Sequence, residues 1–313
     1  MIRSLLIRSL ACAAALTLAA QVAASTRPAL DVTPRPVAPL QATAPASLPV
    51  QPPPPALSFV TFNLQHDREL WRARRELIVR ELGYLRPDVI ALQEVIEHPA
   101  QPNQAQWLAE ALGYDYEFVS SDPPGAAKRY GNALLTRRPV LARHQRMLLP
   151  LDDYRTSAHL RIDLDGTPVN VYVTHLNERA DLHGTRTRTT QIADLMDFVQ
   201  ETSDGAPVAI AGDFNTVADS VDLAALRSHY DDSYAHVHAK DPTPVSTLNV
   251  RFHGKPMRID HIFFDPRRFV ARDAQILFER PDRQGLWASD HYGVWTRLEL
   301  AVDHADPSAM LHP

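Results

Sequence analysis

Short apolar segments alternate with amphipathic ones from Leu57 to about Leu300. The apolar segments, rich in β-branched residues, predict strands at 58–63, 88–93, 115–119, 131–136, 157–163, 169–174, 207–212, 259–264 and 292–299. The amphipathic segments predict helices at 68–85, 103–112, 184–202 and 219–228. Because both kinds of element recur over the whole stretch, we expect a single α/β domain.

Several neighbouring strands are separated only by short turns, such as 137–139 and 165–167. A chain that reverses within a few residues joins antiparallel strands, whereas parallel strands need a longer crossover. The sequence also contains no phosphate-binding glycine loop of the Walker or dinucleotide type. We therefore predict a sheet with many antiparallel hairpins, which argues against a purely parallel nucleotide-binding fold.

The first residues do not follow this pattern. Arg3 and Arg8 precede an apolar run at 10–24 that ends in small residues, which is the order of a signal peptide cleaved after Ala24. The run is shorter than the roughly 20 residues that a membrane span requires. We expect a periplasmic or secreted protein with a signal peptide at 1–24 and no integral membrane segment after cleavage.

The segment 25–56 holds ten of the 26 prolines and few apolar residues. This composition is typical of an extended linker that builds no core. Beyond the last predicted strand the alternation is lost, so 302–313 is predicted to be a disordered tail. The expected domain therefore spans 57–301.

Composition and charge narrow the chemistry. Hydrophobic residues make up 45% of the chain, which is normal for a packed core. Cys12, the only cysteine, lies in the predicted signal peptide, so the mature chain would have neither a disulfide nor a thiolate metal site. Removing Arg3 and Arg8 from a chain of net charge -5 leaves -7. This charge weighs against a tight nucleic-acid-binding protein but permits a nuclease that uses a metal.

Polar residues capable of metal or phosphate chemistry follow or precede six of the apolar strands. They are Asn63, Glu94, His175, Asp213, Asn215, Asp260, Asp290 and His291. Alone, an Asp or Asn after a strand is usually a turn former or helix cap. Together, several carboxylates would repel one another unless a cation or proton lay between them. The set predicts a metal-dependent site, whereas His236 and His238 follow no strong strand and are assigned to a surface loop.

The segments around these residues resemble the endonuclease/exonuclease/phosphatase superfamily of deoxyribonuclease I-like, metal-dependent phosphohydrolases. The resemblance covers 57–301 and rests on 92–95, 174–177, 212–215, 259–262 and 289–291, which occur in the family's order. It implies an α/β fold, a four-layer α/β/β/α sandwich of two mixed, mostly antiparallel sheets flanked by helices. It also implies a monomeric hydrolase of phosphate ester bonds that uses Mg²⁺, with Mn²⁺ as an alternative.

The resemblance assigns roles to individual residues. Glu94, Asn63 and Asp290 would form the metal site, and a lone carboxylate with several waters suits Mg²⁺. The catalytic residues would be His175, Asp213, Asn215, Asp260 and His291, with Asp260 orienting His291. Either His291 or Asp213 could be the general base, and the number of metal ions stays open. Arg188, Asn177 and Arg258 are assigned to substrate binding.

The expected substrate is nucleic acid, so the favoured function is an exported phosphodiesterase of the endonuclease or exonuclease kind. Its support is the family and a set of basic residues expected near the rim: Lys128, Arg129, Arg179, Arg186, Arg251, Lys255 and Arg258. A lipid phosphodiesterase of the phospholipase C or sphingomyelinase kind ranks second, because no aromatic hairpin for a bilayer is evident. A phosphomonoesterase ranks third, and the complete polar set argues against a non-enzymatic binding module.

Overall fold

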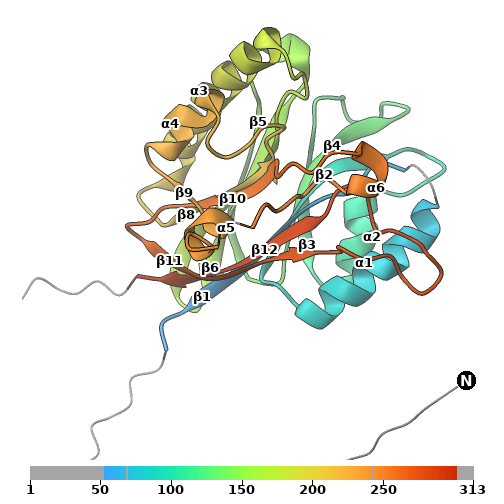
Figure 1. The fold of residues 1–313 in the computed structure, drawn as a ribbon, viewed down its shortest axis with the longest axis horizontal. Helices are drawn as coiled ribbons and strands as arrows, with labels where there is room; N and C mark the ends of the chain where they lie inside the picture. The colour runs from blue at the N-terminus through green and yellow to red at the C-terminus, as the bar shows by residue number, and fades with distance from the viewer. Residues whose placement is uncertain (1–52, 68–69, 242, 302–313) are drawn as a thin grey trace, which may run out of the picture. The chain divides into compact units, whose positions relative to one another are not determined.

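The computed structural model describes residues 53–67, 70–241 and 243–301, and Figure 1 shows the path of the chain. The predicted signal peptide at 1–24, the linker at 25–56 apart from its last four residues, and the tail at 302–313 lie outside the described residues. The fold described below is therefore that of the predicted α/β domain.

The strands form two sheets of six strands each. The first sheet runs in the order β11 (Phe269–Leu277), β12 (Gly293–Leu300), β1 (Ala56–Asn63), β2 (Val89–Glu97), β4 (Arg129–Thr136) and β3 (Asp115–Ser120). The second runs in the order β5 (Val140–Met147), β6 (Thr156–Leu164), β7 (Thr167–His175), β8 (Val208–Asp213), β10 (Asp260–Phe264) and β9 (Asp231–Asp232).

Each sheet has one parallel pair of strands at its centre. These pairs are β1–β2 and β7–β8, and the other neighbouring strands of the described residues pair antiparallel. Both parallel pairs are joined through a long helix, α1 (Trp71–Leu85) or α3 (Leu182–Ser203), as a parallel crossover requires. The predicted mixed, mostly antiparallel sheets are therefore confirmed.

Helices cover the outer face of each sheet (Figure 1). On the first sheet these are α1 and α2 (Gln104–Leu112), and on the second they are α3 and α4 (Ala224–Arg227). Shorter helices lie in the connections: η1 (Leu151–Asp153), η2 (Val221–Leu223), α5 (Ser233–Val237) and α6 (Val250–His253). The layers follow the order helix, sheet, sheet, helix, so the predicted four-layer sandwich is confirmed.

Three apolar clusters hold the layers together. In β1, Leu57 and Phe59 belong to the cluster between the sheets, whereas Val60 and Phe62 pack with α1 and α2. The second sheet and α3 share a third cluster that includes Tyr172, Leu195 and Phe198. Strands covered on both faces need apolar residues at consecutive positions, which explains the nearly continuous apolar runs in the sequence.

The structure differs from the predicted elements at three strands, at one predicted helix and at the short helices η1, α5 and α6, which were not predicted. The sequence analysis missed β5, β9 and β11, and the predicted helix at 219–228 is broken into η2 and α4. Strand β5 was missed because none of its side chains is buried and four of the eight are Arg, His or Gln, as expected at the edge of a sheet. Buried positions of strand β11 alternate with more exposed ones over its first half, so its sequence contains the two-residue period of a strand, although no strand was predicted there.

One edge of the sandwich collects polar strand ends. The carboxyl ends of β1, β2, β7 and β8 lie at the same edge as the amino ends of β10 and β12, because the latter run antiparallel to their neighbours. We call this the site edge. Among the described residues, no helix combines the length and apolar character needed to cross a membrane.

Candidate active site

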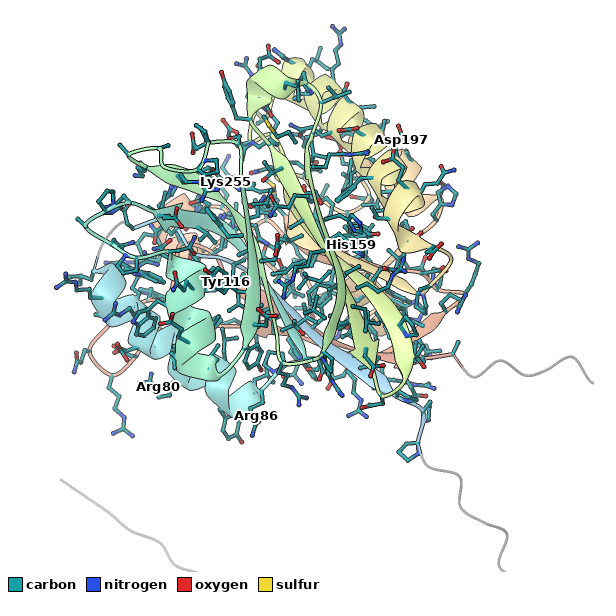
Figure 2. The ribbon with its side chains drawn as sticks, turned by 180° about the vertical axis from the view of Figure 1, so that it is seen from behind. Arg80, Arg86, Tyr116, His159, Asp197 and Lys255 are labelled. Carbon is teal, nitrogen blue, oxygen red and sulfur yellow. The ribbon has the colours of Figure 1, made fainter. Side chains whose placement is uncertain are left out.

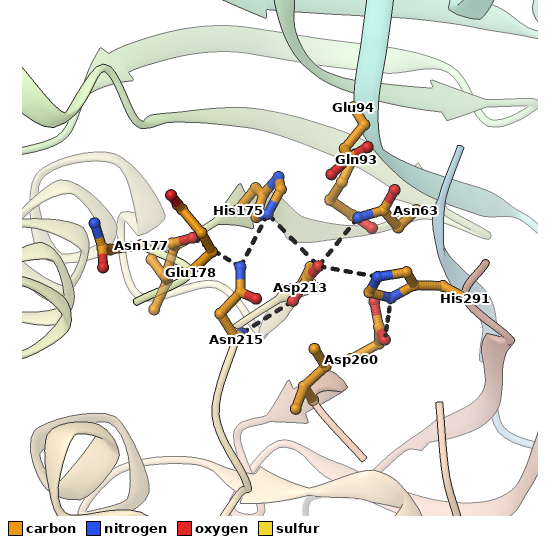
Figure 3. Close-up of polar contacts among 12 residues, drawn as sticks. Asn63, Gln93, Glu94, His175, Asn177, Glu178, Asp213, Asn215, Asp260 and His291 are labelled. Carbon is orange, nitrogen blue, oxygen red and sulfur yellow. Dashed lines mark hydrogen bonds and ion pairs between the residues drawn. The ribbon is translucent and has the colours of Figure 1, made fainter. Parts of the chain in front are cut away.

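Asp213, the last residue of β8, is the centre of the polar contacts at the site edge (Figure 3). Its partners in register are His175 on β7 and Asp260 on β10, so these side chains form a row on one face of the second sheet. From the first sheet, Asn63 Nδ2 donates to Asp213 Oδ2 at 3.0 Å. The carboxylate of Asp213 therefore joins the two sheets.

His291 and Asp260 form a buried pair beside Asp213. His291 Nδ1 lies 2.9 Å from Asp260 Oδ2, and His291 Nε2 lies 3.8 Å from Asp213 Oδ2. The backbone N–H of Asp260 donates to Thr247 Oγ1, and the backbone N–H of His291 donates to Ser289 Oγ. These contacts fix both side chains and leave Nε2 of the imidazole facing Asp213.

His175 lies on the other side of Asp213. Its Nε2 accepts a hydrogen bond from Asn215 Nδ2 at 3.0 Å and is 3.5 Å from Asp213 Oδ2. Its Nδ1 is 3.4 Å from the hydroxyl of Tyr130 on β4. Because Asn215 also donates to the carbonyl oxygen of Leu176, its amide orientation is fixed, and His175 carries its proton on Nδ1.

Glu94 enters the site from a distorted part of β2. The pairing of β2 with β4 shifts register between Leu92 and Val95, and Glu94 itself has φ 57°. This bulge turns its carboxylate toward His66, whose Nε2 is 2.7 Å from Glu94 Oε2. The ring of His66 stacks on Tyr130 with centroids 5.0 Å apart, which connects Glu94 to the surroundings of His175.

Asp290 lies at the outer side of the site. Its Oδ2 is 3.4 Å from His253 Nε2 on α6, and its Oδ1 accepts from Ser289 Oγ at 3.3 Å. The side chain of Asp290 is 22% exposed and that of Glu94 is 18% exposed. Both carboxylates therefore reach solvent, whereas Asp213 and Asp260 do not.

The pKa values of Asp213 and His291 are both raised. Burial and the negative charge of Asp260 raise the pKa of Asp213 to about 7, although His291, Asn215 and Asn63 oppose this shift. Burial lowers the pKa of His291, but the charge and hydrogen bond of Asp260 outweigh it and raise the pKa to about 10. A carboxyl group that exchanges its proton near neutral pH suits a general base.

The pKa values of Glu94 and His175 move the other way. Burial would raise the pKa of Glu94, but the hydrogen bond from His66 and the nearby imidazoles lower it to about 2. Burial lowers the pKa of His175 well below its usual value, and Arg155 adds to this effect. Glu94 is therefore a charged carboxylate at neutral pH, and His175 is a neutral hydrogen-bonding group.

Several site residues have a left-handed backbone. Gln65, His66, Glu94 and Asn215 have φ between 52° and 57°, a region that costs energy for residues with a side chain. The strain at His66 is balanced by Arg74 and Gln104, which donate to its carbonyl oxygen. This clustering of strained positions is typical of functional sites.

The residues assigned to substrate binding are engaged in the protein itself. Buried Arg188 donates to Asp222 at 2.6 Å and to the carbonyl oxygens of Asn177 and Arg179. Asn177 Nδ2 donates to Asp153 at 2.7 Å. These contacts hold the loop after His175 rather than present a free donor.

Arg258 is likewise committed to the protein. It donates to Asp232 Oδ2 at 2.7 Å and lies over the ring of Tyr234, while His261 contacts the same carboxylate. His261 Nε2 also donates to the carbonyl oxygen of Thr216. The group therefore fixes the loop that carries Asn215.

The partly exposed carboxylates of the site are suitable ligands for a divalent cation. Glu94 and Asp290 offer charged oxygen atoms, the type of ligand that Mg²⁺ and Mn²⁺ prefer. Asp260 Oδ1 is buried and, among the described residues, has no hydrogen-bond partner. Asn63, predicted as a ligand, uses its Nδ2 to donate to Asp213 and its Oδ1 to accept from the N–H of Gln65. Its geometry supports Asp213 instead.

The sequence analysis missed His66, Tyr130, His253 and Asn249. His66 lies in a loop, and His253 ends the four-residue helix α6, which is too short to show helical periodicity, so no pattern distinguished them from the other histidines. For Tyr130 the sequence indicated only a position at a strand. His66 follows Asn63 by three residues and His253 follows Asn249 by four. These spacings indicate a role in the site only once the positions of the neighbouring segments are known.

The sequence model of the Endonuclease/Exonuclease/phosphatase family matches residues 60–291. Nocturnin of Drosophila melanogaster is 27% identical over 280 residues, which cover 74% of this chain and 42% of nocturnin. The protein YbhP of Escherichia coli K12 is 27% identical over 193 residues, which cover 56% of this chain and 71% of YbhP. The chain thus spans less than half of the nocturnin that it matches.

Solved structures share the fold. A zebrafish (D. rerio) TDP2 structure, complexed with single strand DNA product, has a TM-score of 0.64 and 20% identity over 78% of this chain and 99% of that chain. The catalytic domain of human Nocturnin with bound sulfate anion has a TM-score of 0.64 and 22% identity, covering 79% of this chain and 94% of that chain. An endonuclease/exonuclease/phosphatase from Beutenbergia cavernae has a TM-score of 0.65 and 22% identity, covering 79% and 72%.

Proposed function

The chain belongs to the endonuclease/exonuclease/phosphatase family, whose members are metal-dependent enzymes that hydrolyse phosphate esters, and we propose that it is a phosphodiesterase. The observation that carries the proposal is the position of Asp213 between two imidazoles. His291, oriented by Asp260, lies on one side of this carboxylate, and His175, held by Asn215, lies on the other. The arrangement can activate water and hold a phosphate at the same place.

Asp213 is the proposed general base. Its Oδ1 accepts from the N–H of Asn215 and its Oδ2 faces the two imidazoles and Asn63, so the carboxylate is held in one orientation. In this position it takes a proton from a water molecule that attacks phosphorus. Of the two bases left open by the sequence, the site supports Asp213, because Asp260 raises the pKa of His291 to about 10 and so keeps both nitrogens of that imidazole protonated at neutral pH.

The two imidazoles on either side of Asp213 have different roles. His291 donates from Nε2, and its charge, balanced by Asp260, offsets the negative charge that grows on the phosphate oxygens. His175 acts as a neutral group, and Asn215 keeps it in place. Replacing His291 and replacing His175 should therefore slow hydrolysis by different factors.

Glu94 and Asp290 would hold the divalent cation, which supplies positive charge to the phosphate when it is bound. Oxygen ligands and access to solvent support Mg²⁺ for Glu94. His66 orients the carboxylate of Glu94 through its 2.7 Å contact. The roles of this chain's own residues do not depend on which cation binds.

Nucleic acid is the proposed substrate. The zebrafish TDP2 of the same fold was solved with a single strand DNA product, and its similarity supports this choice. The basic residues near the rim give less support, because most of them pair with acids: Lys128 with Asp67, Arg129 with Glu97 and Arg179 with Asp181. The affinity for a polyanion would therefore depend on the cation.

A lipid phosphodiesterase is the second candidate, and one observation favours it. Exposed apolar side chains lie on loops at the site edge, among them Leu149, Leu151 and Tyr154 between β5 and β6, and Leu182 at the start of α3. Phe252 and Met257 lie on the loop that carries α6. Such side chains could contact acyl chains at a bilayer surface.

Export and a monomeric state belong to the same proposal. The order of basic, apolar and small residues at 1–24 supports a periplasmic or secreted location. Detection of the processed chain beginning at Ser25 in a periplasmic or culture fraction would test it, and retention of 1–24 would count against it.

The decisive experiment is an assay of the purified chain on plasmid DNA, single-stranded DNA, RNA, sphingomyelin vesicles and a phosphomonoester, with Mg²⁺, Mn²⁺ or EDTA. We expect cleavage of nucleic acid that EDTA abolishes. Asp213→Asn should lower the rate by about 10²- to 10⁴-fold with an unchanged circular dichroism spectrum. Asp163→Asn, which alters a turn carboxylate away from the site, is the matched control.

The outcomes separate the candidates. Cleavage of sphingomyelin without cleavage of nucleic acid would move the proposal to the lipid enzyme. Asp213→Asn with activity close to that of Asp163→Asn would remove Asp213 from the mechanism.

A further inference from the structure

Two histidines and one aspartate lie together at the outer side of the site edge. One ligand atom from each of His253, Asp290 and His291 lies within 4.8 Å of the others. His253 Nε2 is 3.4 Å from Asp290 Oδ2, and the ring of His253 meets that of His291 edge-on with centroids 5.7 Å apart. Two imidazoles and one carboxylate are a donor set of first-row transition metals.

We propose that His253, Asp290 and His291 form a second divalent-cation site, which takes Mn²⁺ or Zn²⁺ in preference to Mg²⁺. The inference shares Asp290 and His291 with the proposed phosphodiesterase. It concerns cation binding by the chain itself, so it can be tested without a substrate.

His253 is held in place by the loop that it faces. Asn249, at the amino end of α6, is fully buried, and its backbone N–H donates to the carbonyl oxygen of Asp290. Its Nδ2 donates to the carbonyl oxygen of Ser289, and its Oδ1 accepts from Tyr292. The helix and its histidine are therefore attached directly to the 289–292 segment, which gives the three ligands a common support.

Exposure decreases along the cluster. The side chain of His253 is 33% exposed, that of Asp290 22% and that of His291 8%. A cation can therefore reach His253 and Asp290 from solvent and contact His291 at the inner end. A ligand set with such an access route is one requirement of a metal site.

The charge of a cation at this cluster fits its surroundings. Asp213 and Asp260 lie just beyond His291, at 3.8 Å and 2.9 Å. A cation on His291 Nε2 replaces the proton there, so in the cation-bound chain the cation supplies the positive charge that the N–H would otherwise offer the phosphate, beside the same carboxylates. Their negative charge therefore favours the cation as it favours the protonated imidazole.

The cluster can be separated from Glu94. Glu94 belongs to β2 and contacts His66, whereas His253 belongs to α6 and contacts Asp290. The nitrogen donors also distinguish the two chemically, because imidazole suits Zn²⁺ and is a better ligand for Mn²⁺ than for Mg²⁺, which is bound through oxygen atoms. A variant of His253 should therefore leave binding at Glu94 intact.

The test is a titration of the metal-free chain with Mn²⁺ alone, followed by electron paramagnetic resonance. We expect the unaltered chain to bind one more Mn²⁺ than His253→Gln, or to bind that ion at least about tenfold more tightly. Pulsed spectra should show coupling of Mn²⁺ to imidazole nitrogen, and this coupling should weaken in His253→Gln. Excess Mg²⁺ should displace Mn²⁺ from the Glu94 site first.

His236→Gln is the matched control, because His236 Nδ1 also lies 3.4 Å from an aspartate, Asp231, and is exposed. We expect His236→Gln to bind Mn²⁺ as the unaltered chain does. Equal binding and equal nitrogen coupling in the unaltered chain and His253→Gln would overturn the proposal, as would an equal loss in His236→Gln.

The two proposals fail independently. Mn²⁺ binding that requires His253, in a chain that cleaves no phosphate ester, would support the cation site and refute the phosphodiesterase. Cleavage of a phosphate ester by a chain that shows no coupling of Mn²⁺ to nitrogen would support the phosphodiesterase and refute the cation site.

Discussion

At the scale of single residues, the contact between His66 and Glu94 controls how firmly the charged carboxylate is held. Both residues have left-handed backbones, and His66 also stacks on Tyr130. A partner that orients a metal ligand typically contributes ten- to hundredfold in metal affinity. His66 is therefore as much a part of the site as the residues named by the family's motifs.

We predict that His66→Ala raises the metal concentration for half-maximal activity about ten- to hundredfold. The reason is that Glu94 loses the imidazole that fixes its orientation. Calorimetric titration of the metal-free chain with Mg²⁺ should show the same weakening.

The matched control is His98→Ala, because His98 lies near the same edge and pairs with Asp67 at 3.5 Å instead of Glu94. An unchanged metal requirement in His66→Ala would contradict the positioning role. Tighter binding in that variant would show that the imidazole competes with the cation.

At the scale of elements, the row formed by His175, Asp213 and Asp260 requires close packing of β7, β8 and β10. Gly212 lies opposite Thr174, and a Cβ on Gly212 would be 2.1 Å from the carbonyl oxygen of Thr174. A side chain here would push the strands apart one residue before Asp213. The glycine is therefore needed by the sheet and by the site that the sheet carries.

We predict that Gly212→Ala lowers the free energy of unfolding by about 1–3 kcal/mol and lowers activity further than this loss explains. Gly83→Ala is the matched control, because its Cβ would meet only Leu112 Cδ2 at an ordinary 3.7 Å inside α1. That variant should gain about 0.5–1 kcal/mol. Urea unfolding measures both, and equal stability of the two variants would refute the steric argument.

The same elements show what the sequence could predict. Strands buried on both faces, such as β1 and β8, were evident as apolar runs, and the polar residues that follow them marked Asn63 and Asp213. The exposed edge strand β5 was missed because its packing imposes no apolar pattern. His66, Asn249 and His253 were missed because a residue in a loop or at a very short helix acquires its role from the strand or loop that it contacts.

Arg188 shows what helical periodicity leaves undetermined. Its spacing from Gln191 correctly placed both on one helical face, but the sequence could not show what that face contacts. Arg188 is buried against Asp222, and Gln191 accepts from the N–H of Asn177. Helical periodicity identifies the face, whereas the contact depends on a partner 34 residues away.

At the scale of the whole molecule, which strand joins which sheet depends on contacts between distant parts of the chain. Strand β1 pairs with β12, with Ala56 opposite Glu299, and its other neighbour is β2. No local pattern encodes that pairing, so the sandwich was predicted through the family's motifs. The antiparallel connections alone were evident from the short turns.

Stability of the whole molecule should depend on pH through His159 on β6, which is labelled in Figure 2. His159 stacks on Tyr172, contacts Phe198 of α3 edge-on and hydrogen-bonds Asn170. Burial lowers its pKa to about 4, and the neighbouring His144 adds to this effect.

Since the ordinary histidine pKa is about 6.5, the unfolded chain binds more protons than the folded chain between pH 6.5 and 4. The free energy of unfolding should therefore fall as the pH falls through this window, by up to about 3 kcal/mol from this residue. Urea unfolding between pH 7.5 and 4 measures the slope. His159→Gln should reduce the slope and His236→Gln should keep it, so equal slopes in all three chains would refute the assignment.

The pairing of β1 with β12 also determines where a tag, a fused partner or a solid support can be joined to the molecule. Both strands run between the site edge and the opposite edge, and Pro55 and Leu300 are hydrogen-bonded neighbours at the latter. A tag, a fused partner or a solid support joined just before Ala56 or just after Ala301 would therefore emerge away from the catalytic residues. Immobilised through either end, the enzyme would keep its open side toward the solution.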